Sequence, residues 1–149
     1  MHTTIIDCKD RYCIIGSGPS GLAQARAFLA LGLPFDVFER HTDIGGLWDI
    51  HNPGTPVYEN THFVSSRTES GFMDFPFPPG ATFPKRDEIL AYLHAFADAY
   101  HLRKHINFSS EVKKVEPKDG FWLVTVQNQT RIYRGVVCAS GMHWEPSSP

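Results

Sequence analysis

The hydrophobic pattern near the start of the chain changes from a short apolar run to an alanine-rich segment. Residues 12–15 are continuously apolar and predict a buried strand. A glycine-rich turn follows, and the alanine-rich segment that ends near Leu31 predicts a helix. A second apolar run, at residues 34–38, predicts another strand. Strand, turn, helix and strand in this order form the unit from which parallel sheets are built.

The middle of the chain, residues 45–84, shows neither a helical nor an alternating period. It is rich in Gly, Pro, Ser, Thr and aromatic residues. About 40 residues of irregular chain far exceed the usual connection of roughly 4 to 6 residues, which indicates a functional or a disordered loop. Disorder is disfavoured because aromatic side chains supply apolar area that we expect to be buried. These residues are Trp48, Tyr58, Phe63, Phe72, Phe75, Phe77 and Phe83.

The pattern becomes regular again in the second half of the chain. A helix is predicted from about residue 85 to 101, with its apolar stripe expected to pack on the sheet. A short strand at 106–108 is followed by a predicted three-stranded antiparallel meander, at 111–116, 121–127 and 130–134. The continuous apolar run 135–139 then predicts a strand buried on both faces of a parallel sheet.

These elements predict the α/β fold class. We expect a Rossmann-like parallel sheet in a single domain spanning residues 1–149, with the small three-stranded β-meander inserted at about 111–134. The chain is long enough for one core of ordinary size, since 42% of its 149 residues are hydrophobic.

Charge and composition exclude several classes of partner. With 14 basic and 16 acidic residues, the chain has no electrostatic feature that favours nucleic acid or an anionic membrane. No apolar run reaches the roughly 18 to 20 residues of a membrane span. Asp7, Lys9 and Asp10 stand where a signal peptide needs its apolar region. We therefore expect a cytoplasmic protein.

The spacing of the cysteines and histidines predicts neither a disulfide framework nor a metal site. The cysteines form no CxxC pair, and Cys13 and Cys138 lie in predicted buried strands, where cysteine behaves as a small hydrophobe. His101 and His105 have the i, i+4 spacing of a ligand pair but lack an acidic third ligand. We expect no metal site.

The turn after the first strand carries the glycine pattern of a dinucleotide-binding loop, Gly16-Ser17-Gly18-Pro19-Ser20-Gly21. Gly16 permits the tight turn, and Gly18 leaves no side chain where phosphates approach the backbone. Gly21 lets the helix pack closely on the strand. The N-terminus of the helix offers free amide N–H groups to the pyrophosphate anion.

Glu39 ends the second strand, at the place where a carboxylate accepts hydrogen bonds from the ribose hydroxyls of an adenosine. Its charge repels a 2′-phosphate, so the sequence favours FAD or NAD over NADP. The joint occurrence of glycine motif and carboxylate disfavours a turn that merely joins strand to helix.

Four segments together resemble the flavin-containing monooxygenases over nearly the whole chain. Besides the glycine motif, they are Phe38-Glu39-Arg40 with Ile44-Gly45-Gly46-Leu47-Trp48, then Asp74-Phe75-Pro76-Phe77-Pro78, and Cys138-Ala139-Ser140-Gly141 with Pro146 beyond. The resemblance implies that the cofactor is FAD. It also implies that Leu47 and Trp48 lie against the flavin, with plain core packing as the alternative for Trp48.

The resemblance implies an extended cofactor-binding set and a reaction. The set comprises Gly16, Gly18, Pro19, Ser20, Gly21, Glu39, Arg40, Gly46, Leu47, Trp48, Ser65, Ser66, Val112, Ala139, Ser140 and Gly141. In this family, NADPH reduces the flavin, molecular oxygen adds to give a flavin hydroperoxide, and one oxygen atom passes to a soft nitrogen or sulfur nucleophile. The flavin performs the chemistry, so the resemblance assigns no catalytic side chain.

Two departures from the family pattern change what is expected. Val64 stands where animal-type members have an Asn that helps to hold the nicotinamide and the oxygenated flavin. Either Ser65 or Ser66 replaces its hydrogen bond, or the hydroperoxide is less protected. The chain also lacks a second GxGxxG, the family fingerprint and the returning C-terminal strand. It resembles the first third of a longer enzyme, truncated before the NADPH domain, and is not expected to turn over alone.

Two other functions are compatible with the same residues. A Baeyer–Villiger monooxygenase, which acts on ketones, shares this half closely, and a non-catalytic dinucleotide-binding module is a further alternative. An NAD-dependent dehydrogenase has no need of the 45–84 loop. The family's strand order would place residues 136–139 beside the first strand, with the missing strand on the far side. We therefore expect that the isolated chain self-associates through 136–139 or is only marginally stable, and that it retains FAD poorly because one wall of the pocket is missing.

Overall fold

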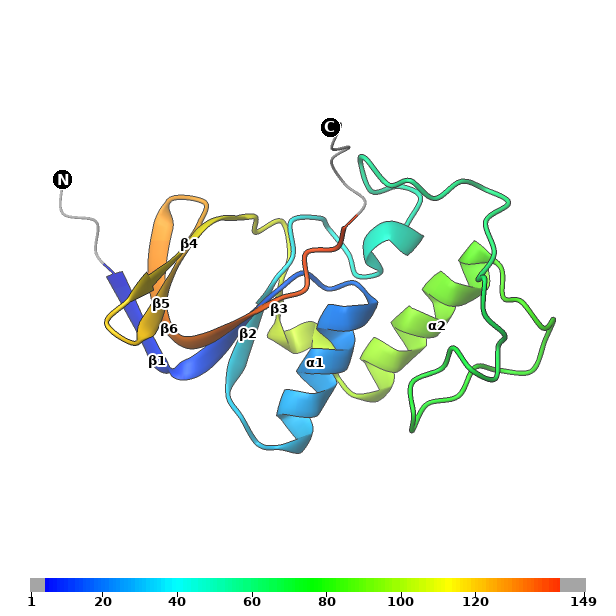
Figure 1. The fold of residues 1–149 in the computed structure, drawn as a ribbon, viewed down its shortest axis with the longest axis horizontal. Helices are drawn as coiled ribbons and strands as arrows, with labels where there is room; N and C mark the ends of the chain where they lie inside the picture. The colour runs from blue at the N-terminus through cyan, green and yellow to red at the C-terminus, as the bar shows by residue number, and fades with distance from the viewer. Residues whose placement is uncertain (1–4, 143–149) are drawn as a thin grey trace.

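A computed structural model describes residues 5–142 as a mixed α/β fold. In chain order the elements are β1 (Ile5–Ile15), α1 (Pro19–Ala30), β2 (Phe35–Phe38), the 3-10 helix η1 (Gly46–Trp48), α2 (Arg86–Ala99), the 3-10 helix η2 (Leu102–His105), β3 (Ile106–Asn107), β4 (Val112–Lys118), β5 (Phe121–Val126) and β6 (Gln129–Cys138), as Figure 1 shows. Pro146, part of the family resemblance, lies outside the described residues.

All six strands belong to one sheet of order β3-β2-β1-β6-β5-β4. The pairs β3-β2, β2-β1 and β1-β6 are parallel, whereas β6-β5 and β5-β4 are antiparallel. The predicted order of the parallel strands is confirmed. The boundaries differ, because the last meander strand and the predicted buried strand are one continuous strand, β6. The first strand also begins at Ile5, well before the apolar run from which it was predicted.

The two helices form for reasons that are visible in their sequences. Pro19 occupies the first turn of α1, where its fixed φ suits a helix and its missing N–H costs nothing, and alanines of high helical propensity follow. In α2 the carboxylate of Glu88 accepts a hydrogen bond from the Lys85 amide at 3.0 Å, which caps the N-terminus. The helix ends before His101, whose φ of 52° is left-handed.

The long loop is irregular, as predicted, but it is held by a buried arginine. Arg67 is 9% exposed, and its guanidinium donates hydrogen bonds to the carbonyls of Pro78 and Ala81. It also forms an ion pair with Glu88 at 2.5 Å, which ties the loop to the start of α2. These bonds satisfy loop carbonyls in the way that regular structure would.

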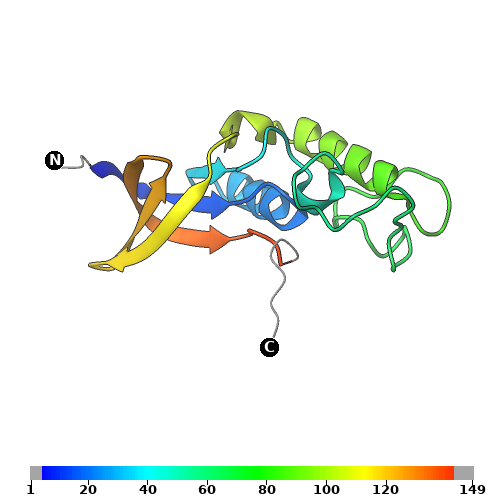
Figure 2. The same cartoon turned by 90° about the horizontal axis from the view of Figure 1, so that it is seen from above.

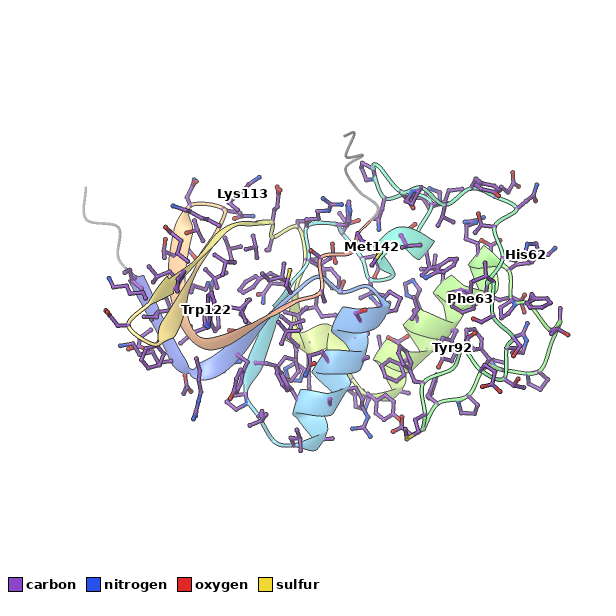
Figure 3. The ribbon with its side chains drawn as sticks, viewed as in Figure 1. His62, Phe63, Tyr92, Lys113, Trp122 and Met142 are labelled. Atoms are coloured by element: carbon purple, nitrogen blue, oxygen red, sulfur yellow. The ribbon has the colours of Figure 1, made fainter. Side chains whose placement is uncertain are left out.

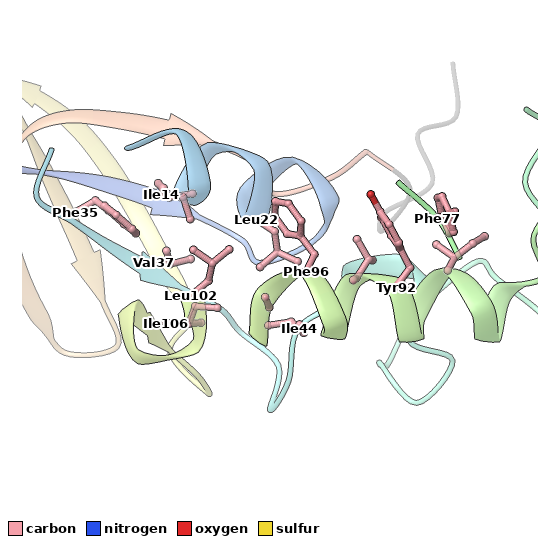
Figure 4. Packing of buried hydrophobic residues seen from close by; sticks show 14 residues of the cluster. Ile14, Leu22, Phe35, Val37, Ile44, Phe77, Tyr92, Phe96, Leu102 and Ile106 are labelled. Atoms are coloured by element: carbon pink, nitrogen blue, oxygen red, sulfur yellow. The ribbon is translucent and has the colours of Figure 1, made fainter. Parts of the chain in front are cut away.

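The core consists of two apolar clusters on opposite faces of the sheet. Ile14 and Val37 face α1 and α2, where they meet Leu22 and Phe96 (Figure 4). The residues that alternate with them on the strands, Cys13 and Phe38, belong to the second cluster with Val124, Val126 and Tyr133. The meander therefore covers the face that the helices leave open. Figure 2 shows the meander and α2 at opposite ends of the molecule.

Three burial predictions were wrong. Cys138 is exposed, because the edge of β6 beyond Tyr133 has no β5 residue beside it. Tyr58 and Phe83 in the long loop are 69% and 50% exposed, whereas the loop aromatic Phe77 is buried and stacks on Tyr92 with ring centroids 3.8 Å apart. Between residues 5 and 142, the structure contains no helix with the length and apolar character to cross a membrane.

Candidate cofactor-binding site

A cavity of about 670 Å³ lies where the carboxyl ends of β1, β2 and β6 meet the glycine turn and η1. Ligands of doubly wound α/β folds bind at this edge of the sheet, next to the point where strand order reverses. The lining residues are Ile15, Gly16, Gly18, Pro19, Ser20, Phe38, Glu39, Arg40, His41, Gly46, Leu47, Glu111, Val112, Cys138, Ala139, Ser140, Gly141 and Met142. Figure 3 labels Met142 on the segment that follows β6.

Close backbone packing fixes the shape of the glycine turn. Gly16 has a φ of 99°, and a Cβ atom there would lie 2.5 Å from the carbonyl oxygen of Ala139. A Cβ on Gly21 would lie 2.8 Å from the Gly16 carbonyl carbon and nearer still to its oxygen. Side chains at these two positions would push α1 away from β1 and β6. The left-handed φ of Gly16 suits the tight turn expected there, and the close approach at Gly21 suits the helix–strand packing expected of the third glycine.

The floor of the cavity is bare backbone beside a helix N-terminus. Gly18 and Gly46 approach each other so closely that a Cβ on Gly46 would lie 3.0 Å from the Gly18 Cα. Gly18 is the N-cap of α1 and carries no capping side chain, and the first turn of the helix contains no acidic residue. Its amide N–H groups and the positive end of the helix dipole therefore suit a phosphate group.

The carboxylate of Glu39 lies beside the turn and is held by three hydrogen bonds. Oε2 accepts from the Ser17 amide at 2.8 Å and from the Ser17 hydroxyl at 2.9 Å, while Oε1 accepts from the His41 amide at 2.9 Å. Glu39 is 4% exposed and still lines the cavity. A negative charge is thus fixed next to an anion-binding helix terminus, a combination that suits a ribose linked to a phosphate.

Arg40 and His41 continue the wall beyond Glu39. Arg40 donates through Nε to Nε2 of His41 at 3.1 Å, so the imidazole acts as an acceptor. Burial lowers the pKa of His41, although the nearby Glu39 charge opposes the shift. The imidazole is therefore neutral at pH 7, and Arg40 supplies the positive charge of this wall. Glu111, paired with Lys113, and Val112 complete it.

Twelve of the sixteen predicted positions line this cavity. Gly21 lies beneath the turn as a packing residue. Trp48 does not line the cavity, and its ring packs against Phe63 in a T-shaped arrangement with ring centroids 4.9 Å apart. Ser65 and Ser66 also lie outside it and hydrogen-bond within their own loop, next to Val64, which is 98% exposed. Contacts from these three residues to a cofactor stay predictions.

Several lining residues were not predicted. His41, Glu111, Cys138 and Met142 reach the cavity from loops and strand ends. No motif marks His41, Glu111 or Met142, because their position depends on how the meander and the end of β6 meet the first βαβ unit. Cys138 begins the Cys138-Ala139-Ser140-Gly141 segment, but the sequence assigned it no contact with a cofactor. Ser17 was visible inside the glycine motif, but nothing in the pattern assigned its side chain a partner.

The residues present fit the adenosine diphosphate part of a dinucleotide. The turn offers space where a Cβ would intrude, the helix N-terminus offers N–H donors, and Glu39 offers a fixed acceptor. A family model described as "FMO-like: Flavin-binding monooxygenase-like" matches residues 9–149. The chain belongs to this family.

Relatives of the flavin-binding monooxygenase-like family are longer than this chain. "Flavin-containing monooxygenase FMO GS-OX1" of Arabidopsis thaliana is 31% identical over 94% of this chain and 37% of its own length. "Flavin-containing monooxygenase 3" of Homo sapiens is 33% identical over 93% of this chain and 29% of its own length. The chain thus spans about a third of the curated relatives it matches.

Solved structures of flavin-binding monooxygenases share the fold. An S-allyl-L-cysteine S-oxygenase from Allium sativum superposes with a TM-score of 0.81 at 25% identity, over 99% of this chain and 39% of the other. A flavin-containing monooxygenase from Stenotrophomonas maltophilia gives a TM-score of 0.80 at 25% identity, over 97% and 42%. The FAD-binding fold class expected from the sequence is confirmed.

Proposed function

We propose that the cavity binds FAD and that the chain is the FAD-binding part of a monooxygenase. The observation that carries this proposal is the fixed carboxylate of Glu39 beside the bare glycine turn and the α1 N-terminus. Pyrophosphate would lie against Gly16, Gly18 and the first amides of α1, and the adenosine ribose against Glu39. Gly46 and Leu47 line the same cavity and would contact the remainder of the cofactor.

We further propose that the complete system uses NADPH and molecular oxygen to oxygenate a soft nitrogen or sulfur nucleophile. FAD, when bound, supplies the redox and oxygen-transfer chemistry, and this chain's residues bind and orient it. The relatives support this substrate class, since the Allium sativum neighbour is named an S-oxygenase of S-allyl-L-cysteine. A nicotinamide would be held by a part of the protein beyond this chain.

A ketone monooxygenase of the Baeyer–Villiger type is the second candidate. It is supported by a cyclohexanone monooxygenase structure that superposes with a TM-score of 0.75 at 26% identity, over 88% of this chain and 26% of the other. Assays of a chain extended through its reading frame, with cyclohexanone and with a thioether as competing substrates, would separate the two candidates. Predominant sulfoxide supports the first, and predominant lactone supports the second.

The purified chain is expected to bind FAD in preference to NADP. Replacing Glu39 with Ala removes the acceptor for the ribose and is expected to weaken FAD binding by roughly 1.5 to 3 kcal/mol, the range for a hydrogen bond to a charged group. Isothermal titration with FAD, NAD and NADP measures both effects. Tighter binding of NADP than of FAD contradicts the proposal.

A matched variant tests whether the expected loss of FAD affinity is specific to a carboxylate in the cavity. Glu69 is an exposed carboxylate of the long loop that does not line the cavity. Glu69→Ala removes the same charge and is expected to leave the FAD affinity within about twofold of the wild type, less than 0.5 kcal/mol. Equal losses in both variants would show that only overall charge matters.

We propose that the isolated chain self-associates through the end of β6. On the side away from β1, β5 pairs with β6 only from Gln129 to Tyr133, so the described strands leave the later residues of β6 without a second neighbour. Unpaired backbone on an apolar edge is a template for another strand. Light scattering is expected to show a mass that rises with concentration. A monomer that stays saturated with FAD at high concentration would contradict this expectation.

A further inference from the structure

The second residue of the glycine motif connects two parts of the cavity. Ser17 is completely buried, and both its amide and its hydroxyl donate to Oε2 of Glu39. The carbonyl of Ser17 accepts a hydrogen bond from the Gly45 amide at 3.2 Å. One residue therefore joins the glycine turn, the end of β2 and the segment that leads into η1.

The hydrogen bonds already made by the Glu39 carboxylate limit the number of acceptor sites that remain for a ligand. An ionised carboxylate has about four lone-pair sites, two on each oxygen. The two bonds from Ser17 occupy those of Oε2, and the His41 amide occupies one on Oε1. A single acceptor site remains, on Oε1.

We propose that Ser17 is a positioning residue that holds Oε2, so that Glu39 recognises one ribose hydroxyl through Oε1. The sequence alone predicts that Glu39 accepts hydrogen bonds from the ribose hydroxyls and does not distinguish one hydroxyl from the other. This inference rests on the proposed binding of FAD, since it concerns the ribose of the same cofactor. A rotamer fixed by two donors also loses no side-chain entropy when the ligand binds, which favours affinity.

The test uses ADP, 2′-deoxy-ADP and 3′-deoxy-ADP as probes of the adenosine end, and FAD as the complete cofactor. Calorimetric titration of the wild type is expected to give one deoxy compound that binds about tenfold more weakly than ADP. The other deoxy compound is expected to bind within about twofold of ADP. Equal losses for both compounds would overturn the single-acceptor geometry.

Variants test whether Ser17 acts through Glu39. Ser17→Ala is expected to weaken ADP and FAD about tenfold and to reduce the difference between the two deoxy compounds. In a Glu39→Ala background the same change is expected to have an effect of less than about twofold. Equal losses in both backgrounds would show a scaffold role only and overturn the inference.

Control measurements distinguish a failure of the proposed role of Ser17 from a failure of the proposed FAD binding. Thr125→Val removes a hydroxyl that pairs with Thr130 in the meander and does not line the cavity, and is expected to leave all four affinities unchanged. ADP binding with the predicted hydroxyl preference but no FAD binding would refute the proposed function and support the role of Ser17. FAD binding that is insensitive to Ser17→Ala would refute the role of Ser17 alone.

Discussion

The 149-residue chain saturated with FAD is expected to show no substrate-dependent oxidation of NADPH. The chain contains one glycine motif of the GxGxxG type, and the cavity formed by the described residues is used by the proposed FAD site. Without a bound nicotinamide near the flavin, the advantage of holding two reactants together is lost. That advantage is worth about 7 to 11 kcal/mol, or roughly 10⁵-fold or more in rate.

Absorbance at the NADPH band, with a tertiary amine or a thioether present, measures this rate. Free FAD at the same concentration serves as the control, because it reports the background reaction in solution. Turnover at ordinary enzyme rates of about 1 s⁻¹ or faster would show that these residues hold the nicotinamide as well.

Gly21→Ala is expected to cause the largest loss of stability among single substitutions at the site. Its Cβ would overlap the Gly16 carbonyl, and because that atom is backbone, no side-chain rotation can relieve the overlap. We expect a loss of about 3 kcal/mol or more in the free energy of unfolding, at the upper end for overpacked sites, together with loss of FAD binding. Urea denaturation monitored by tryptophan fluorescence measures the free energy of unfolding, and calorimetry measures the affinity for FAD.

Gly32→Ala is the matched control for this substitution. Gly32 follows α1 with a φ of 65°, and an added Cβ would meet no atom within 4 Å. The substitution carries only the cost of left-handed backbone, about 1 to 2 kcal/mol, and leaves the cavity unchanged. Equal unfolding midpoints for the two variants would show that close packing at Gly21 has no special importance.

Local sequence motifs predict some residues of the cavity and not the orientation of others. The glycine turn and Glu39 were predictable, because a βαβ unit brings the end of one strand and the end of the next to the same edge of the sheet. Trp48 is a different case. Its segment matched the family, yet its ring packs on Phe63 outside the cavity, and the orientation of a side chain in an irregular loop depends on contacts with distant residues.

The wrong burial predictions also arise because the burial of a side chain depends on residues far away in the sequence. The apolar run at the end of β6 predicted a strand covered on both sides, but Cys138 is exposed since burial depends on which neighbours are present. The long loop was expected to bury all its aromatics. Arg67 and α2 order it so that Phe77 stacks on Tyr92 while Phe83 remains half exposed. No local pattern distinguishes these two phenylalanines.

The sequence by itself determined the order of strands and helices, the parallel half of the sheet and the dinucleotide turn, because periodicity and glycine placement act over a few residues. Tertiary structure alone decided that β6 serves both the parallel strands and the meander, and that the meander covers the second face of the sheet. It also decided that Ser17 and His41 occupy most of Glu39's hydrogen-bonding capacity. The pairing of β6 with β1 and the contact of Ser17 with Glu39 join residues far apart in the chain, and their geometry is fixed only when the two apolar clusters pack.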